Sequence, residues 1–131
     1  MKHTSDIVHH KIAHMLPVLA DDISDYVSSR GTYLHRPIVP KCDKEYESLK
    51  EIFFDMTEFM VDLEEMTSRV INIAKSENDK MTSIFLEKFL FGLCDYTSLV
   101  FSLDSYANKF NSDMDKSVII DLVVDELLDV H

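Results

Sequence analysis

The chain has 131 residues, which is the length of one ordinary domain. Of these residues 46% are hydrophobic, enough to form a core. Its 24 acidic residues exceed its 13 basic residues by 11, and a net charge of -11 repels nucleic-acid phosphates and anionic membranes. Direct nucleic-acid binding and membrane attachment are therefore disfavoured, whereas a basic protein partner would be attracted. We expect a single domain over residues 1–131.

The scarcity of glycine and proline and the lack of alternating polar and apolar residues predict an all-α protein. Only two glycines and three prolines occur, and no long segment alternates polar and apolar residues as a half-buried strand would. A first helix is predicted over about 5–28, and Pro17 within it must kink or break that helix. Residues 30–41 contain Gly31, Pro37 and Pro40, so we expect an extended connection there.

A second helix is predicted over about 42–75, and two stripes of side chains follow it at three- and four-residue spacing. Like charges at this spacing repel by a few tenths of a kcal/mol per pair, so an unbroken anionic stripe suggests use by an outside partner. The apolar stripe consists of Leu49, Ile52, Phe53, Met56, Phe59, Met60, Leu63, Met66, Val70 and Ile73. The acidic row consists of Glu47, Glu51, Asp55, Glu58, Asp62 and Glu65.

The rest of the chain predicts two more helices. The polar segment 76–79 is short, so a third helix over about 80–110 should turn back antiparallel to the second. This helix is apolar on more than one side, which predicts either a central element or a homodimer face. After a loop over 111–115, an amphipathic final helix is expected. The predicted architecture is an antiparallel four-helix bundle with a kinked or broken first helix.

Little in the sequence supports catalysis. The serine, cysteine and histidine residues form no nucleophile arrangement, and two isolated glycines cannot build a phosphate-binding loop. His10 and His14 are four residues apart on a helix, a spacing at which two imidazoles can reach one metal ion. A metal-binding, ferritin-like bundle that uses these histidines and carboxylates therefore stays open as the alternative. We expect no enzyme activity and no cofactor.

The two cysteines indicate the compartment. Cys42 and Cys94 form neither a disulfide framework nor a C-x-x-C pair, as is typical of proteins in a reducing environment. The N-terminal segment lacks the apolar stretch of a signal peptide, and no segment of about 20 residues is free of charge. We therefore expect a cytoplasmic protein.

The C-terminal third, FSLDSYANKFNSDMDKSVIIDLVVDELLDV, places an aromatic helix before an acidic loop and an amphipathic final helix. This pattern of residue classes resembles small helical bacterial immunity proteins of the colicin-D type. In size and charge the chain is also similar to immunity proteins of contact-dependent inhibition systems. The resemblance implies a cytoplasmic protein that binds a nuclease toxin and blocks its RNA-binding site, with carboxylates in place of phosphates.

These observations lead to one functional hypothesis, in which the chain neutralises a basic protein through an anionic surface. Such surfaces accelerate association and provide specificity through charge pairing. The second predicted helix supplies the first group of partner-binding residues, and the C-terminal segment supplies the second group. The first group is Asp55, Glu58, Asp62 and Glu65, and the second is Asp113, Asp115, Asp121 and Asp125.

Overall fold

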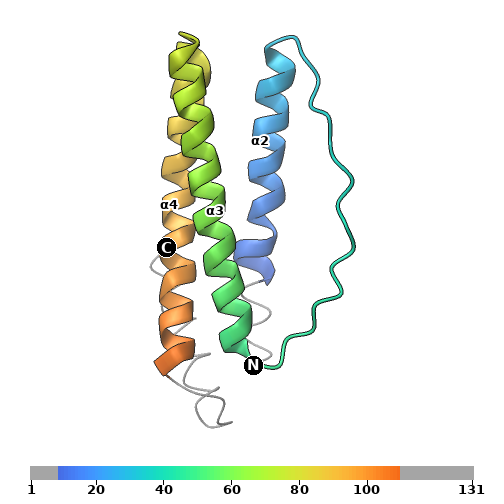
Figure 1. Ribbon diagram of the computed structural model, residues 1–131, viewed down its shortest axis with the longest axis vertical. Helices are drawn as coiled ribbons and strands as arrows, with labels where there is room; N and C mark the ends of the chain where they lie inside the picture. Colours follow the sequence, from blue (N-terminus) through green and yellow to red (C-terminus); the bar gives the residue numbers. More distant parts are fainter. Residues whose placement is uncertain (1–8, 110–131) are drawn as a thin grey trace. The chain divides into compact units, whose positions relative to one another are not determined.

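The computed structural model of the protein describes residues 9–109 (Figure 1). This part contains a π-helical turn, η1, followed by three α-helices, and no strand lies within it. The all-α prediction is therefore confirmed for residues 9–109. The elements are η1 His9–Ala13, α2 Met15–Ser29, α3 Leu49–Ser76 and α4 Lys80–Lys109.

The predicted final helix lies outside the described residues, so the four-helix bundle stays a prediction. The described residues fall into two compact units, residues 9–45 and residues 46–109. The expectation that residues 1–131 form one domain also stays a prediction.

In the first unit, the helical segment is interrupted at His14, between η1 and α2. Pro17 is the third residue of α2, where a missing backbone N–H costs little because the first turn has no acceptor for it within the α-helix. The structure thus contains the break in the first helix that Pro17 predicts. The expected start near residue 5 lies outside the described range.

The segment after α2 has neither helix nor strand from residue 32 to residue 46, as the prolines predict. Gly31 begins it with a φ of 80°, a left-handed conformation that glycine adopts without steric cost. The second helix begins at Leu49, which corrects the predicted start at residue 42. Ser48 fixes this start, because its hydroxyl oxygen accepts a hydrogen bond from the Glu51 N–H at 3.3 Å.

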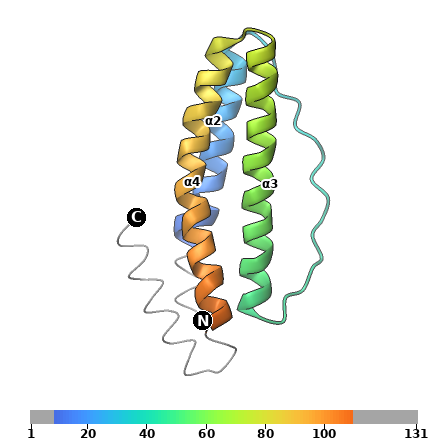
Figure 2. The same ribbon diagram turned by 60° about the vertical axis from the view of Figure 1, so that its left-hand side comes forward.

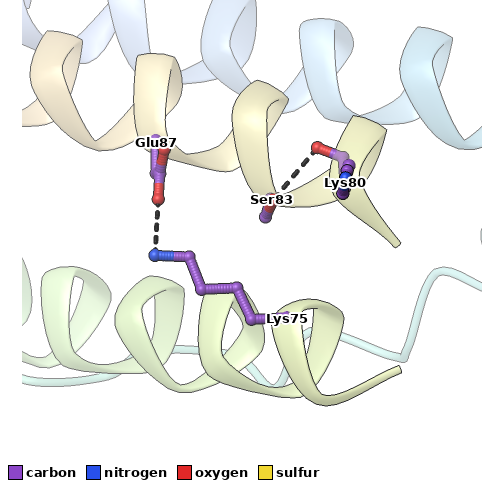
Figure 3. Close-up of polar contacts among 4 residues, drawn as sticks. All are labelled: Lys75, Lys80, Ser83 and Glu87. Carbon is purple, nitrogen blue, oxygen red and sulfur yellow. Dashed lines mark hydrogen bonds and ion pairs between the residues drawn. The ribbon is translucent and has the colours of Figure 1, made fainter. Parts of the chain in front are cut away.

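In the second unit, α3 and α4 form an antiparallel helical hairpin (Figures 1 and 2). Asn78 makes the tight turn in a left-handed conformation, with a φ of 57°, which asparagine tolerates better than most residues. Asp79 then caps α4 by accepting hydrogen bonds from the backbone N–H and the hydroxyl of Thr82. Lys75, before the turn, and Glu87, after it, form an ion pair at 2.8 Å that joins the two helices (Figure 3). The predicted antiparallel return of the third helix is confirmed.

The buried residues of α3 follow one row at spacings built from three, four and seven residues, whereas those of α4 follow a similar row and also include Leu99 and Leu103 beside it. This is the spacing with which two long helices pack side by side. The row on α3 is Phe53, Met60, Thr67, Ile71 and Ala74, and the row on α4 is Ser83, Leu93, Thr97, Val100 and Ala107.

The predicted apolar stripe is therefore only partly correct. Phe53 and Met60 are buried, but Phe59, Met66, Val70 and Ile73 are exposed. The exposed residues lie one position before the buried row, about 100° around the helix. The buried row is less apolar than this neighbouring row, because it includes Thr67.

Candidate partner-binding surface

The N-terminal end of the acidic row is used within the chain. A carboxylate oxygen of Glu51 accepts a hydrogen bond from the Glu47 N–H at 3.1 Å, at the end of the helix where the dipole favours negative charge. Asp55 is half-buried and accepts a hydrogen bond from the Tyr46 hydroxyl at 3.0 Å. Glu51 and Asp55 thus have partners near the start of α3. Asp55 belongs to the first group of predicted partner-binding residues, so this group is partly used within the chain.

The next three members of the row are different. Glu58, Asp62 and Glu65 are exposed, and none of them forms a hydrogen bond or ion pair with another residue in the described range. They are separated by four and three residues, so their charges repel one another along one side of α3. The structure therefore brings these three predicted site residues together on solvent-facing helix surface.

A shallow hollow of about 540 Å³ lies beside this row. Glu65 belongs both to the acidic row and to the wall of the hollow, and Arg69 lies one turn further along the helix. Arg69 forms no ion pair with Glu65 or with any other residue of the described part. The lining residues on α3 are Val61, Glu64, Glu65, Ser68 and Arg69.

Glu64 is a residue that the sequence interpretation missed. It is half-buried, and its Oε1 accepts a hydrogen bond from the Thr97 hydroxyl of α4 at 2.6 Å. It lies four residues after the buried Met60 and three before the buried Thr67, which is the signal in the sequence that could have identified it. Glu64 therefore points toward α4, whereas the neighbouring Glu65 faces solvent.

Cys94 on α4 shares the surroundings of Glu64. Cys94 is exposed, but slight desolvation, the negative charges of Glu64 and Asp95, and a hydrogen bond with Glu64 raise the pKa of its thiol. Because the thiolate is the nucleophilic form, this environment lowers the reactivity of the thiol. The geometry does not indicate a catalytic cysteine.

The alternative metal hypothesis names His10 and His14, and the side chain of His10 lies outside the described part of the structure. His14 contacts His9, with the two Nε2 atoms 3.0 Å apart and the rings edge to face. A π-helical turn, with its bonds from residue i to i+5, aligns residues five apart, and the His14 N–H accordingly bonds to the His9 carbonyl. Within residues 9–109, no group of three or more histidine, cysteine or carboxylate side chains is arranged to hold a metal ion.

The second predicted group, Asp113, Asp115, Asp121 and Asp125, lies outside the described residues. So does most of the segment that carries the resemblance to immunity proteins. Among the helices described here, none combines the length and apolarity needed to cross a membrane. No family model, curated protein or solved structure matches this chain.

Proposed function

We propose that this protein is an acidic helical binding protein that neutralises a basic partner, and that it acts as an immunity protein blocking the active site of a nuclease toxin. The observation that supports this proposal is the set of three exposed carboxylates, Glu58, Asp62 and Glu65, which lack partners among residues 9–109. Their mutual repulsion would be relieved by a cationic surface.

The proposed mechanism is steric and electrostatic. A nuclease binds its substrate through a cationic surface, because every nucleotide carries a phosphate. Carboxylates on a rigid helix can occupy that surface in place of phosphates and exclude the nucleic acid. The net charge of -11 would also accelerate the encounter, by roughly ten- to a thousandfold at low ionic strength.

We propose that the chain completes an antiparallel four-helix bundle, that it acts in the cytoplasm, and that Asp113, Asp115, Asp121 and Asp125 form a second contact surface. Glu58, Asp62 and Glu65 are the first contact surface. Asp55 contributes less, because Tyr46 already donates a hydrogen bond to it.

The test uses a double neutralisation, Glu58→Gln with Asp62→Asn. The partner is sought as a nuclease among the products of the genes next to the gene for this chain, and the readouts are its affinity for the purified protein and survival of cells that produce both. Losing an interfacial carboxylate that pairs with a buried cation costs roughly 2 to 5 kcal/mol, so we expect protection to be lost.

Asp21→Asn with Asp22→Asn is the matched control, because both carboxylates are exposed on α2 and the change in net charge is the same. This control should protect as well as the wild type. Equal protection by the two double variants would refute the assignment of the surface. A neighbouring nuclease that is neither bound nor inhibited by the wild-type protein would refute the proposed function.

A further inference from the structure

Two rows of side chains lie next to each other on one side of the α3–α4 hairpin. The Lys75–Glu87 ion pair fixes which rows these are (Figure 3). Ser68 and Val61 precede Lys75 by seven and fourteen residues on α3, and Cys94 and Phe101 follow Glu87 by seven and fourteen on α4. Residues seven apart share a helix face, so both rows lie on the side of the hairpin where Lys75 meets Glu87.

We call this side the hairpin face. Its α3 row bears two carboxylates that have no partner among residues 9–109, and its α4 row is mainly apolar and aromatic. The hairpin face consists of Phe54, Glu58, Val61, Glu65, Ser68 and Lys75 on α3, and of Ile84, Glu87, Phe91, Cys94 and Phe101 on α4.

The apolar side chains of the hairpin face are open to solvent. Phe91 is 80% exposed, Phe54 is 53% exposed, Ile84 is 50% exposed and Phe101 is 45% exposed. Four large apolar side chains are therefore exposed on one side of two packed helices, where a protein partner could bury them. Glu58 and Glu65 border this surface on the α3 side.

We propose that the hairpin face binds a cationic amphipathic helix of the partner. Its apolar side chains would pack on Phe91 and Phe101, and its lysine or arginine side chains would meet Glu58 and Glu65. From Ile84 to Phe101 the α4 row extends about 26 Å at 1.5 Å per residue, which is the length of a helix of about 18 residues. The furrow between two packed helices accepts such a helix with anchors at three- and four-residue spacing.

Charge complementarity favours a cationic helix over a second copy of the chain or a membrane as the partner of the hairpin face. A second copy of the chain would bring another set of carboxylates and another net charge of -11 toward Glu58 and Glu65. An anionic membrane surface would be repelled in the same way. A helix with an apolar side and a basic side can pack on the apolar α4 row and pair with the carboxylates of the α3 row at the same time. This inference rests on the proposed function and adds the secondary structure and the apolar chemistry of the partner.

The probe is a synthetic 18-residue peptide with leucines along one side of a helix and lysines on the other. A second peptide has the same composition with scrambled order. Binding of each labelled peptide to the full chain is measured by fluorescence anisotropy, and sedimentation records the oligomeric state.

The variants are Phe91→Ala with Phe101→Ala, and Glu58→Gln with Glu65→Gln. Phe59→Ala is the matched control, because Phe59 is 54% exposed on α3 but belongs to neither row.

We expect the amphipathic peptide to bind the wild type and the Phe59 variant equally. Each double variant should weaken binding about tenfold or more, as the loss of central aromatic or charged anchors does at protein interfaces. The scrambled peptide should bind more weakly than the amphipathic one. Circular dichroism of each variant checks the fold, and Phe91→Ala alone repeats the test with a side chain that is almost fully exposed.

Several results would overturn this inference. Unchanged binding by the phenylalanine variants, with weaker binding by the glutamate variant, would leave the proposed function standing and refute the apolar contact. Weaker binding by the phenylalanine variants alone would refute the cationic contact and count against both proposals. Equal binding of the scrambled peptide would refute recognition of a helix. A wild-type dimer that the phenylalanine variants convert to monomer would assign the face to a second copy.

Discussion

The Thr97 hydroxyl on α4 lies 2.6 Å from Oε1 of Glu64 on α3, and this hydrogen bond joins the two helices of the hairpin. The same hydroxyl is 3.0 Å from the carbonyl oxygen of Leu93, one turn earlier on α4. Thr97 is buried, whereas Glu64 is half-buried. A charged acceptor inside a helix interface depends on its donor more than an exposed acceptor does, because less water can replace the donor.

Replacing Thr97 by Val should therefore destabilise the hairpin. The change keeps the shape of the side chain but removes the hydroxyl donor of the Glu64 carboxylate, at a cost of about 1 to 3 kcal/mol. Thr97→Ser retains the hydroxyl and should recover most of that loss. Urea unfolding followed by circular dichroism measures the difference. Equal stability of the Val and Ser variants would show that the hydrogen bond contributes nothing.

Two adjacent phenylalanines allow a test of the buried row. Phe53 is 1% exposed and Phe54 is 53% exposed. Phe53→Ala should cost about 3 to 5 kcal/mol, because it removes buried apolar surface and leaves a cavity. Phe54→Ala should cost much less, since surface changes usually stay within about 0.5 kcal/mol. Thermal unfolding of both variants compares them, and a larger loss for Phe54 would reverse the assignment of the buried face.

The acidic row predicts a conflict between stability and binding. Asp62→Lys replaces two repulsions, with Glu58 and Glu65, by two attractions, and Glu58 stands four residues before the new lysine in the favourable orientation. We expect a gain in unfolding free energy of about 0.5 to 1 kcal/mol at low salt, together with weaker binding to a basic partner.

Asp62→Gln is the control for this variant, because it removes the negative charge without adding a positive one. The difference in stability between the Lys and Gln variants should shrink in 1 M salt, where the Debye length is about 3 Å. A gain that high salt leaves unchanged would point to helix propensity and not to charge.

The raised pKa of Cys94 predicts slow alkylation. In a Cys42→Ser background, less thiolate should be present at a given pH in the folded protein than in urea, because slight desolvation and the charges of Glu64 and Asp95 favour the protonated thiol. The iodoacetamide rate should therefore keep rising with pH beyond the range of an ordinary thiol, whose pKa is about 8.5. Glu64→Gln should raise the rate at fixed pH. Identical pH profiles in the folded protein and in urea would contradict this assignment.

Local chemistry in the sequence predicts the limits of α4 and the place of the extended connection well. The predicted third helix over 80–110 corresponds to α4, Lys80–Lys109, and the extended connection after α2 is found where the prolines predict it. The start of α3 was predicted seven residues too early, because apolar periodicity alone does not identify an N-cap. Ser48 with Glu51 three residues later provides the missing signal, since the Ser48 hydroxyl accepts from the Glu51 N–H and the Glu51 carboxylate accepts from the Glu47 N–H just before the helix.

The buried face of α3 was harder to predict, because two adjacent rows have the same spacing. The row with Phe59, Met66 and Ile73 is uninterrupted by polar residues, whereas the row that is buried includes Thr67 and continues through the half-buried Glu64. Thr67 is tolerated there because its hydroxyl donates to the Leu63 carbonyl at 2.7 Å. The sequence shows the acidic row, but only the folded structure shows that the Glu47 N–H donates to Glu51 and that the Tyr46 hydroxyl donates to Asp55.

The polar contact between Glu64 and Thr97 also limits how far the two helices can slide along each other. A slip of seven residues would bring Glu64 opposite Leu90, which has no side-chain donor, or opposite Asp104, whose charge repels it. Oδ1 of Asp104 is already buried and accepts no hydrogen bond from the residues that the structure describes. Leucine pairs tolerate displacement by a heptad, but one carboxylate matched to one hydroxyl does not, so a single alignment of the hairpin is selected.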